Sequence, residues 1–191
     1  MRVIAGEARG RPLRSPATPG VRPTSDRVRE AMFDVLGSLG VVDGADVLDA
    51  FAGSGALGIE ALSRGARSVT FVDSSRDAVR SVEDNLERVG FSGRREVRVV
   101  RMDVLAFLAS SVASYDVALL DPPYRFDAWE DVLATIDARV VVAESRAPVD
   151  VPDRFELHRV YRYGGTLVTV ASESGRPASA RGGRTAPEGS S

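Results

Sequence analysis

A short apolar run ends in two consecutive prolines, and this feature limits the fold of the middle of the chain more than any other. Residues 117–120 are Val-Ala-Leu-Leu, which predicts a buried strand, and Asp121, Pro122, Pro123 and Tyr124 follow at once. Proline has no N–H and fixes its own φ, so neither proline continues a sheet ladder. The sequence therefore predicts an extended turn whose backbone carbonyls face a cavity, with the ring of Tyr124 beside them.

This turn suits one kind of chemistry, the attack of a planar exocyclic amine on an electrophile. The lone pair of such an amine is delocalised into its ring, and a carboxylate and a backbone carbonyl can each accept one of its N–H bonds. Together they aim the nitrogen, which is catalysis by positioning, and an aromatic ring stacks on the flipped-out base. The alternative is a plain turn at the end of a strand, because Asp and Pro are common turn residues.

The rest of the chain predicts one α/β domain with small appendages. We expect strands at residues 45–49, 68–72, 96–100, 117–120 and 139–143, and helices at 26–39, from 56, and at 75–89, 104–110 and 127–136. Two alternating stretches around Gly164 and Gly165 predict a hairpin over residues 154–171. We expect residues 1–22 to form an N-terminal β-hairpin, residues 23–171 the main domain, and residues 172–191 a disordered tail.

A glycine-rich turn follows the strand that ends in Asp49. The sequence from Gly53 to Gly58 is Gly-Ser-Gly-Ala-Leu-Gly, which places backbone N–H groups and a positive helix end at the tip of a strand. Asp73 ends the next strand, where an acid can accept bonds from two ribose hydroxyls or can cap the following helix. Asp103 can accept from an adenine amino group, with Met102 or Val104 on the ring face, or can simply cap the helix 104–110.

The glycine turn also fits the pattern of an NAD-binding enzyme. Three features count against that interpretation. Asp49 would repel a pyrophosphate but could accept bonds from a cationic ammonium group, and the chain closes with an antiparallel hairpin rather than a second βαβαβ half. In addition, Asp121-Pro122-Pro123-Tyr124 falls at the end of the fourth strand, beside the ligand crevice of an open α/β sheet.

Composition limits the other classes of function. The 191 residues include no cysteine and a single histidine, His158, so a thiolate or His-based metal site is not expected. No run has the length of a membrane span, which predicts a soluble cytoplasmic protein. The net charge is −2, but all 25 basic residues are arginine and five of them lie within residues 1–22 beside a single acid, Glu7. A basic arm on an acidic body suits a polyanion held at one edge; a solvated arm is the alternative.

Several strings of residues resemble a known family. Asp49-x-Phe-x-Gly-Ser-Gly, Asp73, Asp103 and Asp121-Pro-Pro-Tyr are similar to the motifs of class I S-adenosylmethionine (SAM) methyltransferases that modify exocyclic amines. More narrowly, Val3-Ile-Ala-Gly, the string from Arg22 (Arg-Pro-Thr-Ser-Asp-Arg-Val-Arg-Glu-Ala-Met-Phe) and the string that begins at Leu48 resemble the RsmD family. These bacterial enzymes methylate a guanine N2 of small-subunit ribosomal RNA, of the type found at guanine 966 of 16S rRNA. The resemblance extends from the N-terminus to about Ala171.

The resemblance implies a Rossmann-like fold with a seven-stranded, mostly parallel sheet and an antiparallel last strand. It implies that SAM is the cofactor, that 16S rRNA within the small subunit is the partner, and that the protein is a monomer without metal. Asp49 would lie near the ammonium group, Asp73 would bind the ribose and Asp103 the adenine edge. The implied cofactor-binding residues are Asp49, Phe51, Gly53, Ser54, Gly55, Leu57, Asp73, Ser74, Met102, Asp103 and Val104.

The same resemblance gives the residues that hold the substrate. Asp121 and the Pro122 carbonyl would hold the guanine amine, with Pro123 in the turn and Tyr124 stacked on the base. The expected RNA contacts are Arg2, Arg9, Arg11, Arg14, Arg22, Thr24 and Arg27. The Asp-Pro-Pro-Tyr motif is shared with enzymes that act on adenine or cytosine of DNA, and protein glutamine is a further possible acceptor. A non-catalytic RNA-binding module is another alternative.

Overall fold

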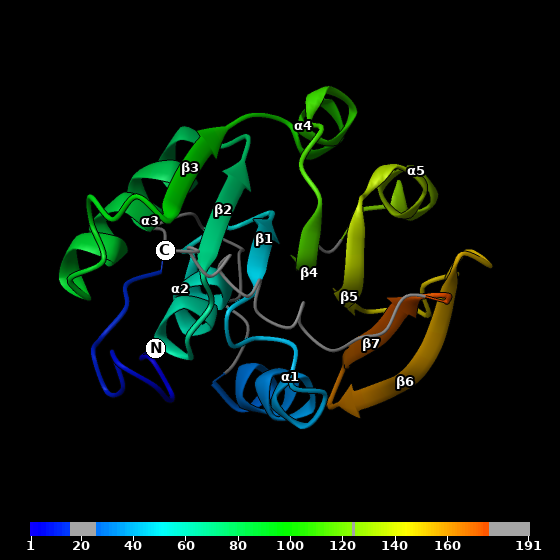
Figure 1. The fold of residues 1–191 in the computed structure, drawn as a ribbon, viewed down its shortest axis with the longest axis horizontal. Coiled ribbons are helices and arrows are strands. Elements are labelled where there is room, and N and C mark those ends of the chain that lie inside the picture. The colour runs from blue at the N-terminus through cyan, green and yellow to red at the C-terminus, as the bar shows by residue number, and fades with distance from the viewer. Residues whose placement is uncertain (16–25, 124, 176–191) are drawn as a thin grey trace, which may run out of the picture.

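The computed structural model describes residues 1–15, 26–123 and 125–175, and its centre is a seven-stranded sheet with the strand order β3-β2-β1-β4-β5-β7-β6 (Figure 1). The strands are β1 (Asp46–Ala50), β2 (Ser68–Asp73), β3 (Val97–Arg101), β4 (Tyr115–Leu120), β5 (Ala138–Ser145), β6 (Phe155–Tyr163) and β7 (Thr166–Glu173). The first five strands pair in parallel, whereas β7 is antiparallel to both β5 and β6. The expected α/β fold with an antiparallel last strand is confirmed.

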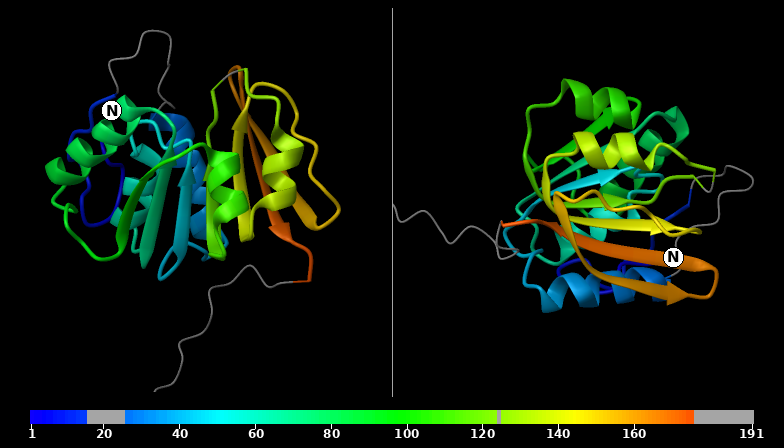
Figure 2. Two further views of the ribbon diagram at one scale, coloured as in Figure 1. Left: turned by 90° about the horizontal axis from the view of Figure 1, so that it is seen from above. Right: turned by 90° about the vertical axis from the view of Figure 1, so that its right-hand side faces the viewer.

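Helices cover both faces of the sheet. They are α1 (Asp26–Ser38), α2 (Ala56–Ser63), α3 (Arg76–Arg88), α4 (Val104–Ser110) and α5 (Trp129–Thr135). The first three supply buried side chains to one core, and α4 and α5 supply them to a second core on the opposite face. The right-hand view of Figure 2 shows α1 on one side of the sheet and α4 and α5 on the other. The expected helix 127–136 is shorter than predicted at both ends.

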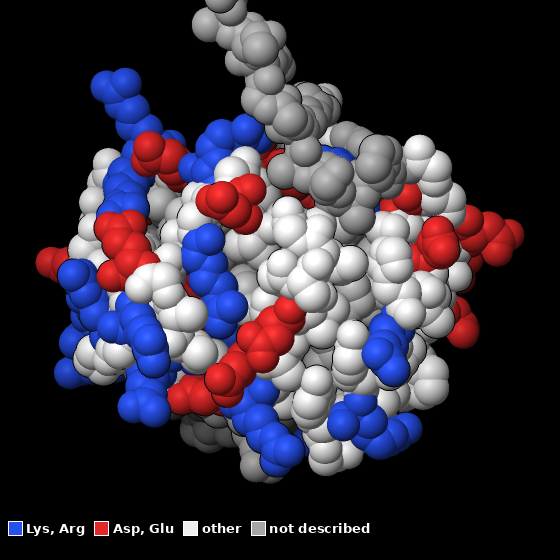
Figure 3. All heavy atoms as spheres, turned by 60° about the horizontal axis from the view of Figure 1, so that its bottom comes forward, with Lys and Arg blue, Asp and Glu red and all other residues white. Residues whose placement is uncertain are grey.

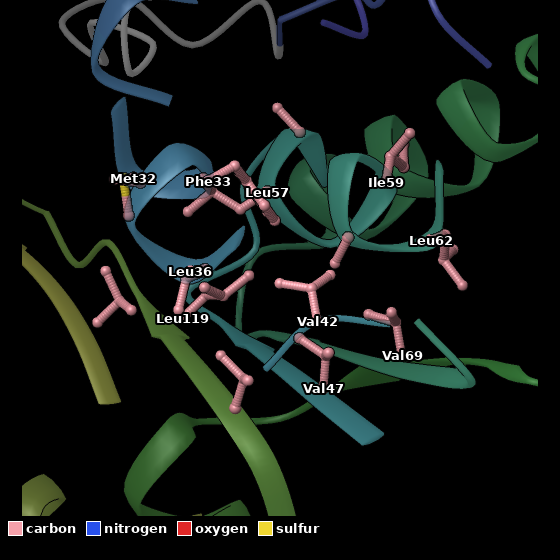
Figure 4. Packing of buried hydrophobic residues seen from close by; sticks show 14 of the residues in the cluster. Met32, Phe33, Leu36, Val42, Val47, Leu57, Ile59, Leu62, Val69 and Leu119 are labelled. Carbon is pink, nitrogen blue, oxygen red and sulfur yellow. The ribbon is translucent and has the colours of Figure 1, made fainter. Parts of the chain in front are cut away.

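The two cores follow from alternation along the central strands. Val47 of β1 and Leu119 of β4 point toward the first core, where Phe33 of α1 and Leu57 of α2 pack over them (Figure 4). Their neighbours along the chain, such as Leu48, point to the second core. Because both faces are covered, the central strands are almost entirely apolar, as is usual for parallel sheets.

Residues 1–15 form a hairpin-shaped segment that packs against the main body. Its two arms are joined by one antiparallel bridge, between Arg2 and Pro12, and by backbone hydrogen bonds from Val3 to Arg11, from Gly10 to Val3 and from Leu13 to Met1, as expected of a hairpin. Between the arms the backbone bonds to α2 instead: Ile4 and Ala5 donate to the carboxylate of Glu60, at 2.8 and 3.0 Å, and Ala8 donates to the Ser63 hydroxyl at 2.9 Å. Buried side chains of this segment, Val3, Ala8 and Leu13, join the first core.

Strands β3 and β6 form the two edges of the sheet. The pairing of β6 with β7 shifts register between Leu157 and Arg159, which marks a β-bulge. Strand β7 extends to Glu173, two residues beyond the domain boundary expected at residue 171. Within the described ranges, no helix has the length and apolarity needed to cross a membrane.

Candidate active site

The residues singled out by sequence lie at the carboxyl ends of neighbouring parallel strands. Asp49 is the second-last residue of β1, Asp73 is the last residue of β2, and Asp121 follows β4 directly. Strands β1 and β4 are adjacent in the sheet although they are far apart in sequence. This position is the topological switch point of the sheet, where open α/β folds form their ligand crevice.

The glycine turn between β1 and α2 has a backbone that favours glycine at two positions. Gly53 and Gly55 have φ values of 55° and 75°, in the left-handed region that side chains with a Cβ rarely adopt. A Cβ on Gly55 would also lie 3.2 Å from a methyl carbon of Val82 on α3, so α2 begins close against α3. Gly55 is the N-cap of α2 and supplies no side-chain cap, and in the first turn the Gly58 N–H bonds to the Asp49 carboxylate.

Asp73 holds this turn in place. One of its carboxylate oxygens accepts from the Gly53 N–H at 2.9 Å, and the other accepts from the Ser75 N–H at 2.8 Å. The N-cap of α3 is Ser75, not Asp73, although capping by Asp73 had been the alternative interpretation. A carboxylate oxygen has two lone pairs, so each oxygen of this half-buried acid can accept a further bond.

Asp49 is an ionisable group in an apolar environment. It is 1% exposed, and one of its oxygens accepts from the Gly58 N–H of α2 at 2.8 Å. Burial raises the pKa of Asp49 well above its usual value, and the negative charges of Asp121 and Asp73 raise this pKa further. The charged form of this acid is therefore unfavourable unless a cation approaches it.

The end of β3 presents one apolar side chain and one acid to solvent. Met102 is 40% exposed, and its N–H donates to the Asp73 carbonyl at 3.0 Å. Asp103 is exposed and caps α4 by accepting from the Ala106 N–H at 3.1 Å. Val104 is buried in the second core, so Met102, and not Val104, is the residue of this pair whose side chain is accessible to a ligand.

A pocket of about 160 Å³ opens beside the two prolines. Its walls come from the end of β4 (Asp121, Pro122, Pro123), from the start of α5 (Phe126, Trp129), from the end of β5 and the turn after it (Glu144, Ser145, Arg146, Ala147, Pro148), and from Thr166 of β7. Tyr124 lies outside the described residues. The pocket is smaller than the roughly 300–1,000 Å³ of sites for drug-sized ligands, which suits one planar ring system.

Three aromatic rings connect the glycine turn to this pocket. The rings of Phe51 and Phe126 are 5.0 Å apart in an edge-to-face arrangement, and the ring of Trp129 is 5.3 Å from Phe126. Phe51 adopts a φ of 63°, which is uncommon for an aromatic residue and directs its ring toward the pocket wall. Sequence reasoning named Phe51 but missed Phe126 and Trp129. The chain's single tryptophan, five residues after Tyr124, was the available signal.

Asn85 is a second residue that sequence reasoning missed. It is fully buried on α3, and its side-chain amide donates to the carbonyls of Ser54 at 2.9 Å and Arg14 at 2.8 Å. Its side-chain oxygen accepts from the Arg14 N–H at 2.9 Å. This one side chain therefore joins the N-terminal segment to the glycine turn. Among the other expected cofactor residues, Leu57 is buried and Ser74 is exposed.

The expected RNA-binding arginines lie at the surface. Arg2, Arg9, Arg11, Arg14 and Arg27 are exposed, whereas Arg22 and Thr24 lie outside the described residues. The Arg11 guanidinium also donates to the Val89 carbonyl at 2.5 Å. In the view of Figure 3, many of the basic side chains lie on the left, with acidic ones among them. One acid of the N-terminal segment, Glu7, pairs with Arg94 at 2.7 Å.

The sheet order and the glycine turn at the switch point define the Rossmann-like fold of class I methyltransferases. The particular family follows from the sequence: residues 1–172 match the family model "Conserved hypothetical protein 95", and the chain belongs to this family, the RsmD family.

Named relatives agree with this placement. The chain is 37% identical over 169 residues to "Ribosomal RNA small subunit methyltransferase D" of Escherichia coli strain K12, and the alignment covers 83% of each protein. It is 35% identical over 188 residues to "Putative rRNA methyltransferase YlbH" of Bacillus subtilis, covering 92% of this chain and 100% of the relative. Among solved structures, "Putative methyltransferase yhhF from Escherichia coli" superposes with a TM-score of 0.79 at 33% identity, covering 92% and 99% of the two chains.

Proposed function

We propose that this chain transfers a methyl group from SAM to the exocyclic N2 of a guanine in the 16S rRNA of the small ribosomal subunit. The observation that carries the proposal is the pocket lined by Asp121 and Pro122, whose wall residue Phe126 contacts Phe51 at the start of the glycine turn. The names of the relatives support rRNA as the substrate class. Membership of a methyltransferase family favours this interpretation over NAD binding.

The residues at the ends of β1, β2 and β3 fit SAM. The N–H groups of the glycine turn would meet its carboxylate, and buried Asp49 would gain from its ammonium group the positive charge that favours ionisation. Asp73 would accept from the ribose hydroxyls, and Met102 and Asp103 would contact the adenine. A Cβ on Gly53 would meet only the Phe51 carbonyl, at 3.8 Å, so space is open above the turn. When bound, SAM supplies an activated methyl group on a sulfonium centre.

The protein residues act mainly by alignment. The guanine N2 lone pair is delocalised into the ring, so the nitrogen needs orientation and desolvation more than a strong base. The Asp121 carboxylate and the Pro122 carbonyl would accept its two N–H bonds. The two prolines hold these acceptors in a fixed turn because proline restricts its own φ.

The direct test uses SAM that carries a labelled methyl group. The acceptors are small ribosomal subunits from a strain that lacks this gene, the matching naked rRNA, and genomic DNA, and the labelled nucleoside is identified after digestion. We expect N2-methylguanosine from the ribosomal substrate. Label in DNA or in a protein fraction would retain the fold and cofactor but refute the proposed acceptor.

Asp121→Ala is expected to abolish methyl transfer while SAM binding stays close to wild type. The reason is that Asp121 follows β4 and lines the proposed guanine pocket, whereas the glycine turn that would hold SAM follows the neighbouring strand β1. Isothermal titration of SAM and single-turnover methyl transfer measure the two properties separately. If SAM affinity falls as much as turnover, this division of roles is wrong.

The N-terminal arginines are proposed to hold the RNA. Deleting the segment would remove Val3, Ala8 and Leu13 from the core, so neutralising substitutions are the better test. Replacement of Arg2, Arg9 and Arg14 by Gln is expected to weaken RNA binding and to reduce the slope of log K against log salt by roughly 0.7–0.9 per lost phosphate contact. The matched control replaces Arg159 and Arg162, two exposed arginines on β6, which is the sheet edge far from the N-terminal segment (Figure 1). An equal loss in the control would refute a specific role for the arm.

A further inference from the structure

The second-last residue of β5 is a buried acid, Glu144, that has no role in the transfer as described so far. Glu144 is 9% exposed and follows four buried apolar residues, 140–143. The side chain lines the pocket beside the two prolines, so a ligand in that pocket comes within its reach.

The register of the sheet sets Glu144 beside Asp121. Leu120 of β4 and Ala143 of β5 are the last partners of the parallel pair, and the residues that follow them are Asp121, just past the end of β4, and Glu144, still within β5. Neighbouring strands lie about 4.8 Å apart. The pocket therefore carries two acids side by side along one wall, with the rings of Phe126 and Trp129 elsewhere in its lining.

Two adjacent carboxylates suit a ligand that presents a row of N–H donors. The Watson–Crick edge of guanine has such a row, with N1–H next to the exocyclic N2 amine. Adenine presents an acceptor nitrogen at N1 instead, and a carboxylate repels it. Arg146 lines the same pocket and carries a guanidinium with five N–H donors, the kind of group that an acceptor such as O6 of guanine requires.

We propose that Glu144 selects guanine by accepting the N1–H bond while Asp121 and the Pro122 carbonyl hold the N2 amine. This inference rests on the proposed function and adds a base-reading residue to it. A site built to hydrogen-bond a donor rejects an analogue that lacks the donor far more strongly than an apolar pocket rejects a change of size. Discrimination at N1 therefore depends on this one carboxylate.

The experiment replaces the target guanine, once mapped, with 2-aminopurine in reconstituted small subunits. This base retains the N2 amine but has an acceptor at N1 and no O6. For the wild type we expect kcat/KM to be at least a hundredfold higher on guanine. In Glu144→Gln the side-chain amide can donate to N1, so kcat/KM on guanine should fall roughly ten- to hundredfold while the ratio of guanine to 2-aminopurine narrows at least tenfold.

Matched measurements separate base reading from structure. Glu156→Gln removes an exposed acid on β6 that does not line the pocket, and it should leave the base preference unchanged. Melting temperature and SAM affinity of Glu144→Gln should stay near wild type. Two results for Glu144→Gln would overturn this inference but not the proposed function. One is an unchanged ratio of kcat/KM on guanine to kcat/KM on 2-aminopurine, and the other is a loss of SAM binding and folding that accounts for the lower rate. Failure of the wild-type protein to make N2-methylguanosine would overturn the proposed function and this inference with it.

Discussion

Replacing Asn85 with Ala tests whether one buried amide joins the N-terminal segment to the glycine turn. The substitution removes three hydrogen bonds, two to Arg14 and one to the Ser54 carbonyl. At about 1 kcal/mol each they contribute about 3 kcal/mol, and the better helix propensity of Ala returns about 0.6 kcal/mol. Buried groups left without partners increase the cost, so we expect the free energy of unfolding to fall by about 2–4 kcal/mol.

Two assays measure the consequences. Urea denaturation followed by circular dichroism gives the free energy of unfolding, and the melting temperature should fall by about 2–4 °C for each kcal/mol lost. SAM affinity, measured by calorimetry, should weaken as well because the Ser54 carbonyl loses its tether. Asp84→Ala on the exposed face of the same helix is the control, with an expected change within about 0.5 kcal/mol. A loss below about 1 kcal/mol with unchanged SAM affinity would refute the proposed connection.

Two further substitutions test the buried acid and the packing of α2. Because the pKa of Asp49 is raised in the folded protein, the wild type should lose stability relative to Asp49→Asn as the pH rises from about 4 toward that pKa, by up to about 1.4 kcal/mol per pH unit. Denaturation across pH measures the difference, and a constant difference would contradict a buried, protonated Asp49. Gly58→Ala should destabilise by about 1–3 kcal/mol, because its Cβ would lie 2.3 Å from a ring carbon of buried Phe71. Gly37→Ala is the control, because a Cβ there meets no atom within 4 Å, and its free energy of unfolding in urea should be unchanged or higher. If both substitutions lower the free energy of unfolding equally, packing against Phe71 is not the cause.

Local signals in the sequence were sufficient for most of the fold. The run from Ser75 to Val89 predicted a helix, and α3 covers Arg76–Arg88, although its cap is Ser75 and not Asp73, the cap that the sequence suggested. The Gly164-Gly165 pair predicted a hairpin, and β6 and β7 flank that turn. The strand ends at Asp49, Asp73 and Asp121 followed from apolar runs and turn residues, which depend only on neighbours in the chain. These predictions needed no information about distant contacts.

Features that depend on distant contacts were missed or only partly predicted. Asn85 resembles a surface residue of α3 in sequence, and it is buried only because the N-terminal segment, 71 residues away, packs over it. Glu144 gains its place beside Asp121 from the register of β4 and β5. The N-terminal hairpin was predicted, but its contact with α2, where Ile4 and Ala5 donate to the carboxylate of Glu60, depends on residues 55 and 56 positions away and was not.

The bulge and the arginines on the outer strands have a consequence for encounters between copies of this protein. An open sheet edge offers unpaired backbone groups on which a second chain can extend the sheet. Here one edge strand, β3, exposes Arg98 and Arg101, and the other, β6, exposes Arg159 and Arg162 next to its bulge. When the edge strands of two copies meet, their arginines repel each other and the bulge of β6 prevents regular pairing. Joining two copies into one continuous sheet is therefore unfavourable even at high concentration.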